Sequence, residues 1–226
     1  ATVTPDGTKT IFNIDGADAT VEHSPGYFNF VSSNEAVAVV TNGVIHVVGG
    51  GNAVITAKLG TVDATGAVTL NVTSPPSSAA PTPTVPAANV ISLFSNAYPN
   101  VTVDTWSAAW DAANVADMKI ANNDVKIYTG LSFAGIEFTT NPIDATAMTT
   151  FHLDVWAPTG TTFKVKLVDF GEDGTYGGAP DSEHELTFNA ASTPPFSAGA
   201  WIGLEIPLAN FTGLTGRAHL AQLILS

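Results

Sequence analysis

The chain has 226 residues, of which 45% are hydrophobic and only 12% are charged, so it carries enough apolar material for a packed core and is not a disordered chain. Its 20 acidic and seven basic residues give a net charge of −13, which disfavours nucleic acids, anionic membrane surfaces and heavily sulfated glycans as partners but is compatible with neutral glycans and divalent cations. Cysteine is absent, which excludes disulfide bonds, thiol catalysis and cysteine-ligated zinc.

The first 73 residues alternate between short apolar runs and turn signals. Residues 36–40 (AVAVV) are followed by Asn42-Gly43, a strong tight-turn signal, and then by residues 44–48 (VIHVV). Several short strands at this spacing predict a small β-sandwich. The segment offers no cluster of chemically active side chains, and its resemblance to bacterial immunoglobulin-like family 2 domains, carried by residues 30–73, implies that residues 1–73 form a spacer domain.

Residues 74–88 (SPPSSAAPTPTVPAA) contain five prolines and no charged residue. Proline lacks an amide donor and keeps the chain extended, so this stretch is predicted to be a semi-rigid linker. A long loop inside one domain is the alternative.

Residues 89–226 also contain alternating strands, at 151–156, 163–168 and 183–188. Each has an apolar face and a polar face, which is typical of an antiparallel sandwich with one side exposed to water. The polar side chains of the three strands are expected to form one mixed surface: His152, Asp154, Trp156, Lys164, Lys166, Glu183 and Glu185.

All four tryptophans follow the linker. Sugar rings stack their C–H faces on flat aromatic rings, and their hydroxyls bind carboxylates and amides. Trp106, Trp110 and Trp156 are therefore candidate stacking residues, with burial in the core as the alternative for each. Trp201 alternates with apolar neighbours and is expected in the core.

The segment from Asp169 to Glu183 is rich in oxygen ligands and glycine. Such a loop suits calcium, with Asp169 and Asp173 as candidate ligands, although the EF-hand pattern itself is absent. The alternatives are a solvated loop, or a contact surface in which Tyr176, Asp181 and Glu183 bind sugar.

Two family resemblances sharpen these expectations. Roughly residues 30–73, including SSNEAVAVVTNGVIHVVGGGNAVITAKL, resemble bacterial immunoglobulin-like family 2 domains. From residue 90 onward, VISLFSNAYPNVTVDTW, VKIYTGLSFAGIEF, FHLDVWAPTGTTFKVKLVDFGEDGTYGG, SEHELTF and IPLANFTGL resemble a C-terminal module of laminarinases and surface glycan-binding proteins of marine Bacteroidetes.

The second resemblance implies a jelly-roll module that binds β-glucan, with β-1,3-linked laminarin first. It also implies an extracellular or outer-membrane location and a role in a cell-surface glycan-uptake system. The fold class expected from all these observations is all-β: a small immunoglobulin-like sandwich followed by a β-jelly-roll sandwich, as a monomer.

The function expected is binding of a neutral polysaccharide without catalysis. A glycoside hydrolase needs two suitably spaced carboxyls. Glu183 and Glu185 share a strand face, but the Glu-x-Asp-x-x-Glu pattern of retaining laminarinases is absent. A structural or adhesin β-module without a small ligand is the other alternative.

Overall fold

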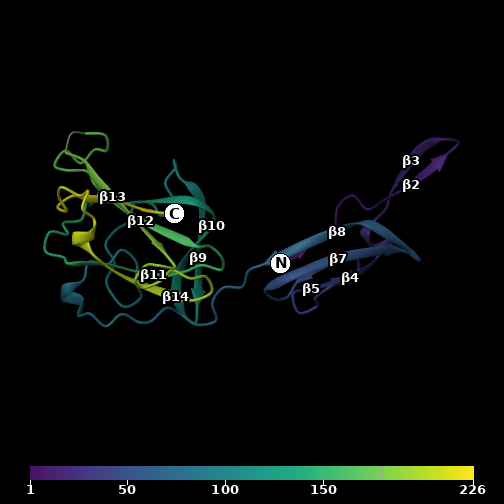
Figure 1. Cartoon of the computed structure of the whole chain (residues 1–226), viewed down its shortest axis with the longest axis horizontal. Coiled ribbons are helices and arrows are strands. Elements are labelled where there is room, and N and C mark those ends of the chain that lie inside the picture. Colours follow the sequence, from purple (N-terminus) through teal and green to yellow (C-terminus); the bar gives the residue numbers. More distant parts are fainter. Residues whose placement is uncertain (179) are drawn as a thin grey trace. The chain divides into compact units, whose positions relative to one another are not determined.

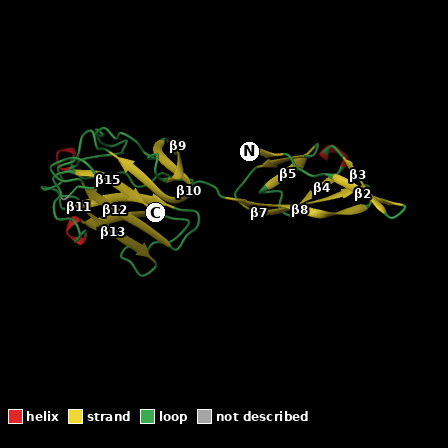
Figure 2. Cartoon of the chain, turned by 90° about the horizontal axis from the view of Figure 1, so that it is seen from above, coloured by secondary structure: helices red, strands yellow, loops and turns green. Residues whose placement is uncertain are grey.

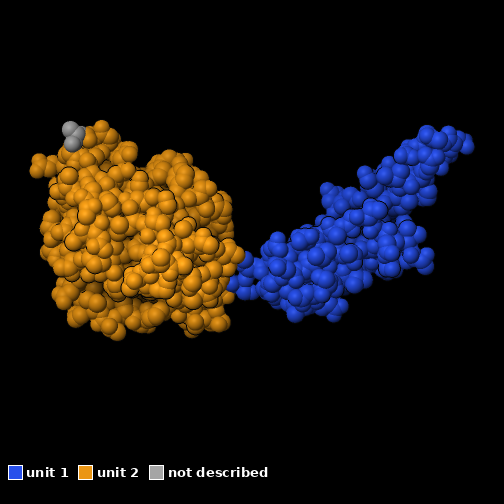
Figure 3. All heavy atoms as spheres, in the orientation of Figure 1, with its two compact units in different colours: residues 1–74 blue, residues 75–226 orange. Residues whose placement is uncertain are grey.

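The computed structural model describes residues 1–178 and 180–226. The chain divides into two compact units, Ala1–Ser74 and Pro75–Ser226 (Figure 3). Both are built from β-strands (Figure 2), and the helical elements of the described residues are three 3-10 turns: η1 (Pro25–Tyr27), η2 (Ala87–Asn89) and η3 (Leu208–Asn210). The predicted all-β class is therefore confirmed. In this described part of the chain, no helix has the length and apolar character needed to cross a membrane.

The first unit contains eight strands in three antiparallel sheets, ordered β1-β6-β5, β4-β7-β8 and β2-β3. The strands are β1 (Thr2–Val3), β2 (Lys9–Ile14), β3 (Ala17–Glu22), β4 (Asn29–Ser32), β5 (Ala38–Thr41), β6 (Val44–Val47), β7 (Gly51–Leu59) and β8 (Val62–Val72). Val37, Ile45 and Ile55 are almost completely buried at the centre of its core.

The turn predicted between the two valine-rich runs is confirmed. Thr41 pairs with Val44, so Asn42 and Gly43 alone connect β5 to β6. Their φ angles are 51° and 75°, in the left-handed region that Asn and Gly accept most readily. A Cβ at Gly43 would also lie 2.7 Å from the backbone of Pro25, so the turn needs glycine for space as well.

The second unit contains a five-stranded sheet of order β13-β12-β15-β10-β9 and a two-stranded sheet, β11-β14 (Figure 1). Its strands are β9 (Ala112–Ile120), β10 (Asn123–Glu137), β11 (Thr150–Trp156), β12 (Thr162–Asp169), β13 (Ser182–Asn189), β14 (Trp201–Pro207) and β15 (Leu220–Leu225). All pairings are antiparallel. The three strands predicted in this half correspond to β11, β12 and β13.

The core of the second unit lies between these two sheets. Val165 and Leu223 from the larger sheet and Leu204 from the smaller one belong to the same buried cluster. Because side chains alternate along a strand, the residues next to them point out of the sandwich-like arrangement. The two sheets therefore expose two separate outer faces.

The proline-rich segment contacts the second unit at two places. The Trp201 indole Nε1 donates a hydrogen bond to the Ser78 carbonyl (2.8 Å). The Tyr98 hydroxyl donates one to the Val85 carbonyl (2.7 Å). These bonds hold residues 78–85 against the unit that follows them.

Candidate functional site

The outer face of the five-stranded sheet brings together three of the predicted site residues: Trp110, Glu183 and Glu185. Cross-strand pairing builds two rows over β13, β12, β15 and β10. The first row is Glu185, Lys166, Ile224 and Gly135, and the second is Glu183, Val168, Gln222 and Glu137. Four neighbouring strands span about 14 Å at the usual spacing. Val168 and Gln222 are buried and Gly135 lies under Trp110, so the exposed groups are mainly at the two ends of the rows.

Trp110 lies flat on one end of this face. Its ring stacks on Phe133 with centroids 6.2 Å apart and an interplanar angle of 19°. The ring covers Gly135, where a Cβ would come within 2.4 Å of the indole. Trp110 nevertheless remains 46% exposed and Phe133 37% exposed, so the two rings present an apolar surface to solvent.

Hydrogen bonds fix the orientation of the Trp110 ring. Its Nε1 donates to Glu137 Oε1 (3.0 Å), and Gln222 Nε2 donates to the same oxygen (2.9 Å). The amide of Gly135 donates to Asp111 Oδ2 (3.0 Å), which anchors the residue next to Trp110. The ring is thus pre-organised, and little conformational entropy would be lost when a ligand contacts it.

Gly135→Ala is expected to displace this ring, because the new Cβ and the indole cannot share the space. Overpacking of this kind lowers the free energy of unfolding by about 1–3 kcal/mol. Chemical denaturation and the chemical shift of the Trp110 indole N–H measure the two effects. Gly66→Ala is the matched control, since a Cβ there meets nothing within 4 Å. Unchanged stability and an unchanged indole shift in the Gly135 variant would contradict the packing.

The β13 edge of the face carries two ion pairs between β12 and β13. Lys166 Nζ lies 2.9 Å from Glu183 Oε1, and Lys164 Nζ lies 2.8 Å from Glu185 Oε1. The hydrogen bond with Glu183 raises the pKa of Lys166 above its usual value of 10.5. Because the pKa of Lys166 is higher in the folded state than in the unfolded state, the ion pair with Glu183 stabilises the fold at pH values below the unfolded-state pKa. This contribution is present at neutral pH and is lost at alkaline pH above 10.5.

These ion pairs bear on catalysis. A glycoside hydrolase needs one carboxyl that donates a proton to the leaving group. Glu183 and Glu185 instead both accept hydrogen bonds from lysine ammonium groups. These bonds fix the positions of the two carboxylates on the face.

Tyr176 belongs to the loop between β12 and β13 and is 62% exposed. Its ring contacts Phe170 at 5.6 Å between centroids. Phe170 is buried with Val168 and Ala221 in a small cluster. A second exposed aromatic ring is therefore packed close to the β12 end of the face.

Three aspartates at this loop accept hydrogen bonds from backbone amides: Asp169, Asp173 and Asp181. Asp181 Oδ2 accepts a hydrogen bond from the Gly177 amide (2.6 Å), and Asp173 Oδ1 accepts one from the Thr175 amide (3.0 Å). Asp169 is 3% exposed, and its two oxygens accept from the amides of Gly171 (2.8 Å) and His219 (3.0 Å). Asp169 thus connects the start of the loop to the segment before β15.

The calcium site at Asp169 and Asp173 stays a prediction. Within the described ranges, no three His, Cys, Asp or Glu side chains form a potential metal-binding group. Bound calcium would stabilise the folded state, so it predicts that EDTA lowers the thermal midpoint of unfolding and that added calcium restores it. An unchanged midpoint would contradict the site and leave Asp169 as a loop anchor.

The structure divides the polar surface that the sequence predicted as one. Trp156, His152 and Asp154 lie on the smaller sheet, where Val155 and Ile202 point inward. The lysine–glutamate pairs lie on the larger sheet. The expectation of a single mixed surface was wrong, because β11 pairs with β14 and not with β12.

Trp201 is also on the outer face of the smaller sheet, opposite Trp156. The prediction that Trp201 belongs to the core was wrong, because the neighbouring residue and those that alternate with it along β14 face the core instead. Ile202, Leu204 and Ile206 occupy the core-facing positions, and the half-buried Trp201 instead donates its indole hydrogen to the proline-rich segment.

Trp106 is separated from the outer face. It packs against the core cluster, meets Phe94 edge to face (5.4 Å, 69°) and is covered by Lys126, whose Nζ is 4.9 Å from the ring. This tryptophan is therefore surrounded by protein groups on several sides.

Sequence reasoning missed four residues of the face: Phe133, Gly135, Glu137 and Gln222. The alternation in residues 133–137 (FAGIE) was an available signal, since Ala134 and Ile136 are the buried partners.

Comparisons with protein-family models, with curated proteins and with solved structures found no match to this chain.

Proposed function

We propose that the second unit binds a neutral polysaccharide without cleaving it, on the outer face of the five-stranded sheet. The observation that carries this proposal is the half-exposed Trp110 ring, held flat beside Phe133 by its bond to Glu137. A flat ring accepts the C–H face of a sugar, and neighbouring carboxylates and ammonium groups accept and donate hydrogen bonds to the hydroxyls.

Charge supports a neutral ligand. The two lysines of the face are each paired with a glutamate, and the chain has a net charge of −13. A heavily sulfated glycan would be repelled by the overall field and would find no unpaired lysine on β12.

The sequence resemblance makes β-1,3-glucan (laminarin) the first ligand to test. It also supports, as parts of the same proposal, an immunoglobulin-like first unit, a jelly-roll second unit, and a monomeric protein that captures glycan at the bacterial surface. An open face buries little ligand area, so the affinity is expected to be micromolar to millimolar per site.

Affinity electrophoresis of the whole chain in gels containing laminarin, a mixed-linkage β-glucan or a sulfated glycan tests the proposal. We expect laminarin to retard the chain, the sulfated glycan to leave it unaffected, and the reducing-sugar content of laminarin to stay constant. No retardation by any glycan would overturn the proposal in favour of a structural module, and release of reducing ends would indicate an enzyme.

A further inference from the structure

Arg217 is the only arginine in the chain, and it differs from most of the lysines in having no acidic partner among the described residues. Five of the six lysines form ion pairs with carboxylates: Lys58, Lys119, Lys126, Lys164 and Lys166. The guanidinium is the cation best suited to bidentate carboxylate binding. In a chain with 20 carboxylates, its lack of a partner indicates that its donors serve another purpose.

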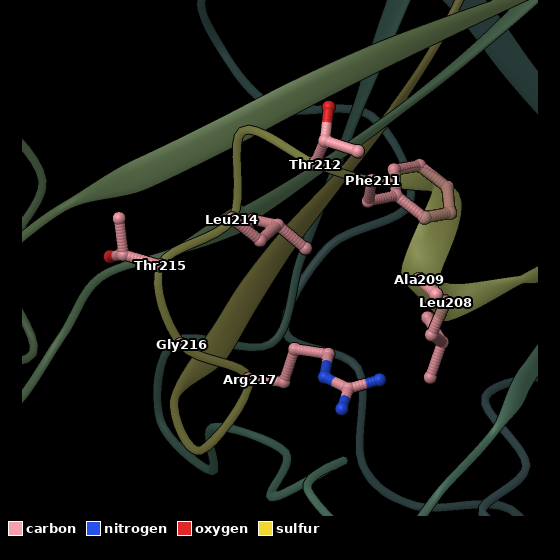
Figure 4. A pocket seen from close by; sticks show the side chains of 8 residues that line it. All are labelled: Leu208, Ala209, Phe211, Thr212, Leu214, Thr215, Gly216 and Arg217. Atoms are coloured by element: carbon pink, nitrogen blue, oxygen red, sulfur yellow. The ribbon is translucent and has the colours of Figure 1, made fainter.

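Arg217 lines a cavity of 270 Å³ at the end of the second unit, between η3 and β15. Figure 4 shows the guanidinium extending toward Leu208 and Ala209. Leu208 and Phe211 lie beneath the cavity but are only 4% and 2% exposed, so most of the accessible lining of the cavity is polar. The one hydrogen bond recorded for the guanidinium among described residues goes from Nη1 to the Met148 carbonyl and is long, at 3.4 Å.

Hydrogen bonds hold the segment that carries Arg217. The amide of Thr215 donates to Ser182 Oγ (3.1 Å), and the amide of Gly213 donates to His184 Nδ1 (2.9 Å). The Arg217 carbonyl accepts from the Ala145 amide (2.7 Å). The backbone on both sides of the cavity is thus fixed to β13 and to the segment before β11.

Asp144, the acidic residue next to Ala145 in the sequence, already accepts hydrogen bonds within its own turn. Asp144 Oδ1 accepts hydrogen bonds from the amide and the hydroxyl of Thr146, which lower the pKa of this carboxyl. It is therefore held in its own turn, and the guanidinium stays available to a ligand.

We propose that this cavity binds the carboxylate group of a sugar acid or a similar small acid, with Arg217 as the anion-binding residue. The volume lies just below that of typical ligand pockets, so it fits one small group. The strong net negative charge disfavours multiply charged phosphate or sulfate relative to a singly charged carboxylate.

The test is a titration of the ¹⁵N-labelled whole chain with D-glucuronate, followed by amide chemical shifts, with D-glucose as the neutral control. We expect glucuronate, and not glucose, to shift the amides of residues 212–217 in a saturable way. Arg217→Gln should weaken binding at least about tenfold, because a hydrogen-bonded charge is lost. Arg217→Lys retains the positive charge but not the bidentate geometry of the guanidinium, so its affinity for glucuronate should lie between those of the wild type and Arg217→Gln.

Equal shifts with glucose, shifts elsewhere only, or unchanged affinity in Arg217→Gln would overturn the proposal. The wild-type titration decides even if a variant fails to fold. A second titration uses a glucuronate-containing oligosaccharide. Binding of both the free acid and the oligosaccharide assigns the cavity to a polymer-borne carboxylate, whereas binding of the free acid alone assigns it to a small molecule. Binding of neither overturns the proposal. The proposal is independent of the glucan face, because Trp110→Ala should leave glucuronate binding intact and Arg217→Gln should leave laminarin binding intact.

Discussion

Trp110→Ala is expected to remove most of the affinity for laminarin, at a cost of about 1–3 kcal/mol in binding free energy. The substitution deletes an exposed ring that is already oriented by Phe133 and Glu137. Isothermal titration calorimetry with laminarin oligosaccharides measures the loss. Because about half of the ring is buried against Phe133 and Gly135, the substitution should also lower the free energy of unfolding, and chemical denaturation shows whether the variant is folded at the temperature of the titration.

The matched control is Trp156→Ala. Trp156 is also an outward-facing tryptophan of the second unit, but it belongs to the smaller sheet and lies opposite Trp201. Its removal should leave laminarin affinity unchanged if the larger sheet carries the site. The reverse result, with Trp156 essential and Trp110 dispensable, would move the site to the other face.

Asp169→Ala is expected to cause the largest loss of stability among the site-adjacent residues, about 3–5 kcal/mol of unfolding free energy. The carboxylate is 3% exposed and accepts hydrogen bonds from the amides of Gly171 and His219. Alanine would leave both amides without their acceptor in a buried region. Chemical denaturation with a fixed slope measures the change.

The control for this prediction is Asp173→Ala in the same loop. Asp173 is exposed and accepts its bond from the nearby Thr175 amide, so its loss should cost much less than that of Asp169. Equal effects of the two substitutions would show that Asp169 does not anchor the loop.

The sequence predicted the strands well where alternation is regular. Phe163, Val165 and Leu167 do face the core, and Lys164 and Lys166 do face outward. The turn at Asn42-Gly43 was equally accessible, because it depends on local backbone preference. Local signals therefore gave the elements and the polarity of their faces.

The arrangement of the strands was not accessible in the same way. Alternation in residues 201–206 is compatible with two orientations of the strand, in which either Trp201 or Ile202 faces the core. Only the packing against the five-stranded sheet shows that Ile202 and not Trp201 faces inward. Likewise, Trp110 covers Gly135 through a contact 25 residues along the chain, which no local pattern encodes. Strand order and loop placement are tertiary properties, and they decide which candidates meet.

The contacts of the proline-rich segment have a practical consequence for dissecting the protein. A fragment that begins at Asn89 would omit the Ser78 and Val85 carbonyls, the acceptors of the Trp201 indole and the Tyr98 hydroxyl. Fragments and fusions of the second unit should therefore begin at Pro75. Melting curves of fragments that begin at Pro75 and at Asn89 would show how much the segment adds to thermal stability.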